Sequence, residues 1–128
     1  MSTKKYATSA IALLAALAAT PPAHATGSVK EGTVRTVVIG QGLQVDEVIA
    51  AVDGRHRGLK ARSALVRDGR RIRTLGEWKA AEYKEIADFK GEFVSWKIDR
   101  AFHHNDRICV VFEGLRERPC VTLREVRR

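Results

Sequence analysis

Alternation of apolar and polar residues dominates the C-terminal third of the chain. The segments EFVSWKIDRAF, RICVVFE and CVTLREV each place apolar side chains at every second position, which is typical of strands with one buried face. The polar segments HHND and GLRERP separate them. The pattern therefore predicts three consecutive antiparallel strands.

Two apolar segments precede this region in the first half of the chain. The β-branched run TVRTVVI, residues 33–39, predicts a strand. Residues 43–52, LQVDEVIAAV, fit either a helical stripe or a strand. Their β-branched content and the turn-forming VDGR behind them favour the strand.

The segment SALVRDGRRIRTL predicts a β-hairpin. Asp68-Gly69 stands between two apolar-alternating runs, as in a two-residue type I′ loop. Pairing about this loop places Leu65 opposite Ile72 on the buried face. The solvent-facing side then carries Arg62, Arg71 and Arg73.

One helix is predicted, over about residues 76–90. Thr74 and Glu77 have the spacing of a capping box, and Gly91 follows where a C-terminal cap belongs. A helix here would share one face among Trp78, Ala81, Ile86 and Phe89.

These elements predict an α+β fold. We expect a bent antiparallel sheet, or a small partly open β-barrel, of about six strands with the single helix covering one face or end. The predicted core is Trp78, Ile86, Phe89, Val94, Trp96, Ile98, Ile108, Val110, Phe112, Val121 and Leu123.

The N-terminal segment predicts export. Lys4 and Lys5 precede a run of Ala, Ile and Leu over residues 10–19, and Ala23-His24-Ala25 forms a small-residue cleavage site. The run is too short to span a bilayer, which needs roughly 20 residues. We predict a cleavable signal peptide over residues 1–25 and one small domain over residues 26–128, in the periplasm or secreted.

Export determines how the cysteines are interpreted. Cys109 and Cys120 are the two cysteines of the chain, and an even pair in an oxidising compartment normally forms a disulfide. A hairpin centred on Gly114-Leu115 would place them directly opposite each other. We therefore predict a disulfide across this hairpin.

Positive charge is concentrated in one stretch. Without Lys4 and Lys5 the chain has 21 basic and 15 acidic residues, but between positions 55 and 73 eight bases face the single acid Asp68. Such a field concentrates anions around it, and arginine suits bidentate binding of phosphate or carboxylate. The predicted binding residues are Arg55, Arg57, Lys60, Arg62, Arg67, Arg70, Arg71 and Arg73. The alternative is a solvated basic face that keeps the protein soluble.

The expected partner is an acidic protein or an anionic envelope component. No Phe, Tyr or Trp lies between residues 40 and 77, so the basic stretch lacks stacking platforms for a nucleic acid. We therefore do not expect a nucleic-acid partner, and no motif calls for a cofactor.

The segment HHND is the only cluster that resembles a catalytic or metal site. His103, His104 and Asp106 are residue types that bind transition metals or transfer protons. Adjacent histidines on a strand point to opposite faces, however, and a polar hairpin turn would have the same composition. No metal site is predicted.

Together these features favour an exported, non-enzymatic binding module that uses the basic surface over residues 55–73 and the disulfide-stapled hairpin. An inhibitor or immunity protein is the specific form of this hypothesis. The alternative is a small periplasmic metal- or His-dependent enzyme centred on HHND.

Overall fold

The structure, a computed structural model, describes residues 25–125 and consists of nine antiparallel strands. The predicted signal peptide lies outside the described residues, except for its last residue, Ala25, which begins the first strand. The strands are β1 (Ala25–Glu31), β2 (Val34–Gln41), β3 (Gln44–Asp53), β4 (Lys60–Arg67), β5 (Arg70–Ala80), β6 (Glu82–Ile86), β7 (Phe89–Ala101), β8 (Arg107–Phe112) and β9 (Cys120–Thr122).

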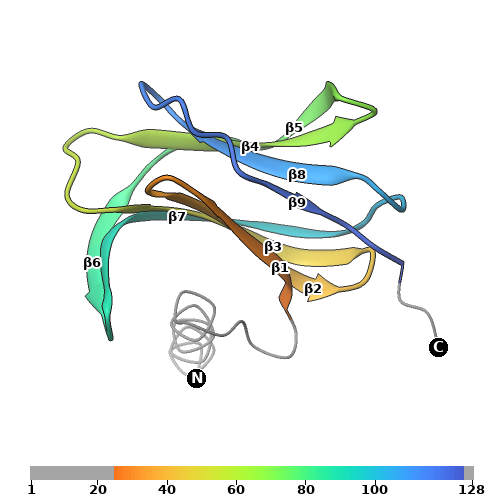
Figure 1. Cartoon of the computed structure of the whole chain (residues 1–128), viewed down its shortest axis with the longest axis horizontal. Coiled ribbons are helices and arrows are strands. Elements are labelled where there is room, and N and C mark those ends of the chain that lie inside the picture. Colours follow the sequence, from red (N-terminus) through yellow and green to blue (C-terminus); the bar gives the residue numbers. More distant parts are fainter. Residues whose placement is uncertain (1–24, 126–128) are drawn as a thin grey trace.

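These strands form two sheets that pack face to face. The first has the order β1-β2-β3-β7-β6 and the second the order β5-β4-β8-β9. Figure 1 shows the four-stranded sheet above the five-stranded one. The fold is therefore all-β and not closed into a barrel, which contradicts the predicted α+β class with about six strands. Residues 25–125 contain no helix, and hence none that could cross a membrane.

The main core lies between the sheets. Val48 and Val52 on β3, Val94 on β7, and Ile108 and Phe112 on β8 all contribute side chains that are at most 3% exposed. A second apolar cluster occupies the opposite face of the five-stranded sheet, and its buried members are Val37, Ile49, Ala51 and Phe93. Residues 43–52 thus form the favoured strand, with apolar side chains on both faces.

The predicted helix over residues 76–90 is wrong. Its sequence forms the end of β5, all of β6 and the start of β7. A two-residue turn at Ala87-Asp88 makes Ile86 and Phe89 cross-strand partners, and Ala87 has a φ of 52°. The i,i+3 spacing that resembled a helical stripe therefore arises from a β-turn, which brings the same two residues onto one face of a sheet.

A long-range contact explains why the capping-box segment is extended. The Trp96 ring lies against the backbone of Gly76, where a β-carbon would come within 2.4 Å of the ring. The Trp96 indole N–H donates to the Glu77 carbonyl oxygen at 3.0 Å. In the predicted helix this carbonyl oxygen would instead accept a hydrogen bond from the backbone N–H of the residue four positions later in the chain. Packing of β5 on β7 thus overrides the local signal.

Trp78 is the clearest error in the predicted core, because it is 41% exposed. Ile86, Phe89 and Ile98 are half-buried at the edges of the two clusters. The other predicted core residues are buried: Val94, Trp96, Ile108, Val110, Phe112, Val121 and Leu123.

Candidate functional site

The β4–β5 hairpin carries most of the predicted basic residues. Its two-residue turn is confirmed: Asp68 and Gly69 have φ values of 53° and 76°, and Arg67 pairs with Arg70. Positive φ at both central positions is what a type I′ loop requires. The hairpin covers one edge of the four-stranded sheet.

A β-bulge changes the predicted register beyond this turn. Val66 pairs with Arg71, but Leu65 pairs with Arg73 instead of Ile72, which is 46% exposed. Directly paired residues share a face, and neighbouring residues of one strand point to opposite faces. Arg71 and Arg73 therefore lie on opposite sides of the sheet, contrary to the predicted single face.

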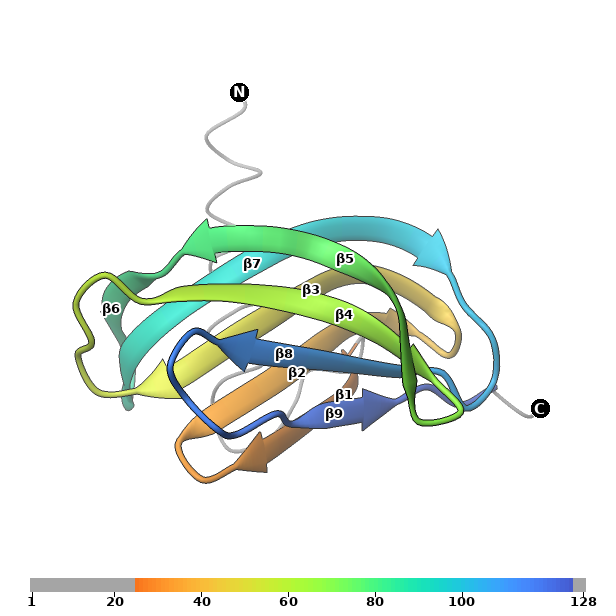
Figure 2. The same cartoon turned by 90° about the horizontal axis from the view of Figure 1, so that it is seen from above.

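Three arginines gather on the outer side of the four-stranded sheet, the side turned away from the core. Arg71 and Arg107 both pair with Val66, from β5 and β8 respectively. Arg62 lies further along β4 on the same side, with its guanidinium carbon 4.9 Å from the centroid of the Trp78 ring. We call Arg62, Arg71 and Arg107 the outer arginine face; Figure 2 looks onto it, with β4 between β5 and β8.

Arg107 was missed by sequence reasoning because it follows the basic stretch by more than thirty residues. Only the β4–β8 pairing brings it beside Arg71. Charged residues that are adjacent only across paired strands cannot be recognised as neighbours by counting charges along the sequence. The apolar alternation of RICVVFE was the available signal, because Ile108 faces the core and the preceding Arg107 therefore faces away from it.

Arg55 and Arg57 do not join this face, whereas Lys60, two residues before Arg62, lies on the same side at its far end. Arg55 and Arg57 lie in the loop between β3 and β4, and Lys60 begins β4, at the end opposite the Asp68-Gly69 turn. The Arg55 guanidinium covers the Tyr83 ring at 4.2 Å. The structure therefore spreads the basic stretch along the hairpin, and it does supply aromatic neighbours, Trp78 and Tyr83, from outside the stretch.

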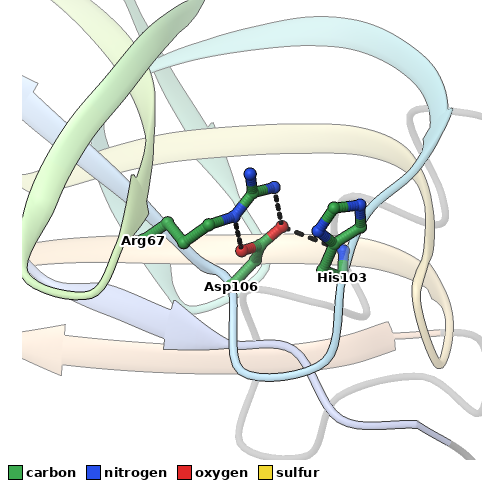
Figure 3. Close-up of polar contacts among 3 residues, drawn as sticks. All are labelled: Arg67, His103 and Asp106. Atoms are coloured by element: carbon green, nitrogen blue, oxygen red, sulfur yellow. Dashed lines mark hydrogen bonds and ion pairs between the residues drawn. The ribbon is translucent and has the colours of Figure 1, made fainter.

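Arg67 is bound within the protein. Its Nε and Nη2 atoms donate to the two carboxylate oxygens of Asp106 at 2.8 and 3.0 Å. The backbone N–H of His103 donates to Asp106 Oδ2 at 2.9 Å, as Figure 3 shows. The Asp106 side chain is only 1% exposed. Its charge is therefore compensated where it lies, and Arg67 has less positive charge to offer a partner.

These contacts also set the protonation of Asp106. The hydrogen bonds from Arg67 hold the pKa of Asp106 below its ordinary value, with the His103 amide adding to the effect and burial opposing it. The same pairing raises the pKa of Arg67. Asp106 is thus a carboxylate that orders the β7–β8 turn.

The histidines of HHND line one open hollow of about 210 Å³ together with Asp106, Asn105, Arg67 and Asp68. His103 and His104 are both exposed. His104 Nδ1 accepts the backbone N–H of Glu125 at 3.0 Å, and Asn105 has a φ of 72° within the turn. His56, the third histidine of the described chain, contacts the Asp53 carbonyl oxygen in another loop. Among residues 25–125, no group of three or more His, Cys, Asp or Glu side chains is arranged to hold a metal ion.

The predicted disulfide is present. Cys109 on β8 pairs directly with Cys120 on β9, their Cα atoms are 4.1 Å apart, and the bond is formed. The strand pairing is thus the one predicted for a hairpin centred on Gly114-Leu115. Its loop is longer than a tight turn, because residues 113–119 connect the strands and contain a turn in which the Leu115 N–H donates to the Phe112 carbonyl.

This longer loop is held against the rest of the fold. Thr36 Oγ1 donates to the Pro119 carbonyl at 2.6 Å, and the Arg118 N–H donates to Glu31 Oε2 at 3.2 Å. Leu115 packs against the main core. The loop of the stapled hairpin is therefore anchored by long-range hydrogen bonds, and its tip is folded onto the sandwich.

Comparisons with known proteins add no functional assignment. No protein-family model matches the chain, and neither the curated proteins nor the solved structures give a match. The functional argument therefore rests on the geometry of this chain alone.

Proposed function

We propose that this protein is an exported, non-enzymatic binding module that holds an anionic partner on the outer arginine face. The observation that carries the proposal is the pairing of Arg71 and Arg107 with the same residue, Val66. Neighbouring strands lie roughly 4.8 Å apart, so the two arginine backbones are about 10 Å apart on the same side of the sheet. Both side chains are exposed.

The chemistry of this face suits anions. Guanidinium groups bind carboxylate and phosphate with two parallel hydrogen bonds. The stacking of Arg62 on Trp78 holds a third guanidinium at the same surface, since a cation over an aromatic face is attracted by the ring. The partner is an acidic protein or an anionic envelope polymer, and an inhibitor or immunity protein is the specific form of the first case.

The exported location is part of the proposal. A disulfide persists in the periplasm or outside the cell and is rare in the cytosol, and Cys109–Cys120 is formed. The signal-like N-terminal segment supports the same assignment.

The test is affinity capture from an envelope extract with the immobilised, oxidised domain, washed at low and then high salt. We expect the double variant Arg71→Glu/Arg107→Glu to lose the captured partner. Arg55→Glu/Arg57→Glu changes the net charge equally at the far end of β4 and should retain it. Equal loss in both variants would contradict the proposal, because binding would then follow net charge alone.

The salt wash distinguishes the two partner classes. A discrete protein that survives high salt has desolvated contacts in a shaped interface, as an inhibitor would. A polyanion that leaves at high salt is held by screened attraction, which would rule out the inhibitor form.

The enzyme alternative has its own variant. His103→Ala/His104→Ala should leave capture intact. If this variant abolished the protein's function in cells while Arg71→Glu/Arg107→Glu had no effect, the binding-module hypothesis would give way to that of a His-dependent enzyme.

A further inference from the structure

The two sheets meet along a seam between β5 and β7. Two hydrogen bonds cross it at one end: the Trp96 indole N–H to the Glu77 carbonyl at 3.0 Å, and Lys79 Nζ to the Ser95 carbonyl at 2.9 Å. Figure 2 shows the two strands running side by side along this edge. The opposite end of the seam, toward Arg73 and Arg100, is hollowed instead.

Two adjoining cavities lie at this hollowed end and share Arg73 and Arg100 in their walls. The first, of about 180 Å³, is also lined by Thr74, Leu75 and Ile98. The second, of about 210 Å³, extends toward the β7–β8 turn and includes Leu65, Arg67 and Phe102 among its lining residues. Each cavity thus combines the same two arginines with apolar side chains.

The charges of these two arginines are not compensated within the described chain. Within residues 25–125 neither Arg73 nor Arg100 makes an ion pair or a side-chain hydrogen bond. Arg67 in the second cavity differs, because Asp106 binds it with two hydrogen bonds. Two positive charges from different strands, β5 and β7, therefore border one hollow without an internal counter-ion.

We propose that Arg73 and Arg100 bind a phosphate group, carried as a monoester on the anionic partner. This inference rests on the proposed function and specifies which anionic group the partner presents. The bulge that pairs Leu65 with Arg73 is what turns Arg73 away from the outer arginine face and into the seam. Arg100, which lies outside the basic stretch of the sequence, completes the pair.

Phosphate suits this site better than carboxylate for two reasons. A phosphate monoester carries close to two negative charges at neutral pH and three strong acceptor oxygens. Those oxygens are enough to accept hydrogen bonds from both guanidinium groups at once. A carboxylate carries one charge and two oxygens. Leu75 and Ile98 beside the arginines offer contact to the organic part of an ester.

The test is an NMR titration of the oxidised domain with inorganic phosphate at constant ionic strength, with acetate as the comparison anion. We expect saturable shifts at Arg73, Thr74 and Arg100, with phosphate binding at least tenfold more tightly than acetate. Glycerol phosphate, an organic monoester, should bind more tightly than inorganic phosphate.

Variants locate the site. Arg73→Gln and Arg100→Gln should each weaken phosphate binding at least tenfold. Arg71→Gln, two residues away on β5 but on the outer side, should change it less than twofold. All three positions are exposed, and unchanged spectra away from the substitution check folding. Equal weakening in Arg71→Gln, or shifts that follow ionic strength alone, would overturn the inference.

The outcomes separate this inference from the proposed function. Loss of capture in Arg71→Glu/Arg107→Glu without any phosphate shift at Arg73 and Arg100 would overturn the phosphate site alone. Phosphate binding without any captured partner would overturn the outer arginine face and leave the site standing. Acetate binding as tightly as phosphate would replace the phosphate monoester with the carboxylates of an acidic protein.

Discussion

Two hairpins of similar length serve different purposes in this molecule. In the β2–β3 hairpin the apolar side chains of both faces are buried, toward the main core on one side and the second cluster on the other. In the β4–β5 hairpin, β4 buries its core-facing side chains while β5 is largely exposed. The β2–β3 hairpin therefore contributes mainly to packing, whereas the β4–β5 hairpin pairs a buried strand with an exposed, charged one.

The strand pairing is also less regular in the exposed hairpin than in the buried one. The β2–β3 pairing has one register shift, whereas the β4–β5 pairing has three. Bulges redirect side chains and increase local twist. A regular β5 would aim Arg71 and Arg73 at one face, and the bulge beside Leu65 distributes them over two surfaces. Irregular pairing in the exposed hairpin thus determines where its charges lie.

Introducing an aspartate into each hairpin should show the largest difference in stability between them. Val48→Asp places a carboxylate at a fully buried position in the main core and should cost at least about 3 kcal/mol of unfolding free energy, because a buried unpaired charge is unsolvated. Arg71→Asp should change it by less than about 0.5 kcal/mol, as is usual for exposed sites. Urea denaturation measures both, and similar losses would mean that β5 contributes to packing after all.

Removal of the disulfide tests how the charged hairpin's sheet is stabilised. The cysteines are separated by 11 positions, and closing so short a loop restricts the unfolded chain by about 3 kcal/mol. Cys109→Ser/Cys120→Ser should therefore lower the free energy of unfolding by about that amount. Amide exchange should show the greatest loss of protection in β8 and β9 rather than in β2 and β3. Uniform loss over both sheets would argue against a local role.

A smaller effect is expected at the turn end of the charged hairpin. Asp106→Asn removes the carboxylate that accepts hydrogen bonds from Arg67 and His103 and should destabilise the protein at pH 7 by more than about 1 kcal/mol. The pKa of Asp106 is lowered in the folded state. The carboxylate therefore stabilises the fold above the unfolded-state pKa, roughly 3.9, and this contribution is lost as pH falls through the folded-state pKa.

Thermal unfolding at pH 7, 4 and 3 checks this prediction. The difference between wild type and Asp106→Asn should narrow as the pH falls. Asp68→Asn is the matched control, since Asn-Gly suits the same type I′ turn and Asp68 is exposed. A difference that stays constant from pH 7 to pH 3 would contradict the assigned role of the Asp106 charge.

The sequence predicted the features that depend on neighbours in the chain. The Asp68-Gly69 turn is confirmed because its chemistry is local. The Cys109–Cys120 bond is confirmed. Three strands do form in the C-terminal region, because alternation reports a half-buried strand, but β7 and β8 lie in different sheets and β9 ends at Thr122. Residues 43–52 are a strand, as favoured, but their second apolar face has no signature that separates it from a helix.

The features that depend on distant partners could not be predicted. The extended course of residues 76–80 follows from the contacts of Gly76 and Glu77 with Trp96. The outer arginine face and the seam cavities need Arg107 and Arg100, which reach the hairpin only through strand pairing and sheet packing. A linear charge count finds the basic stretch, but it does not find the faces on which those charges lie.

The two tryptophans give this molecule a built-in optical reporter. Trp96 is 8% exposed, with its indole N–H bonded inside the fold, while Trp78 is 41% exposed beneath the Arg62 guanidinium. An anionic quencher such as iodide is concentrated by the surrounding cations and reaches Trp78 but not Trp96. The fluorescence of Trp78 therefore reports whatever occupies the charged side of the sandwich. Trp96 supplies an internal reference, because its fluorescence is not quenched from the solvent.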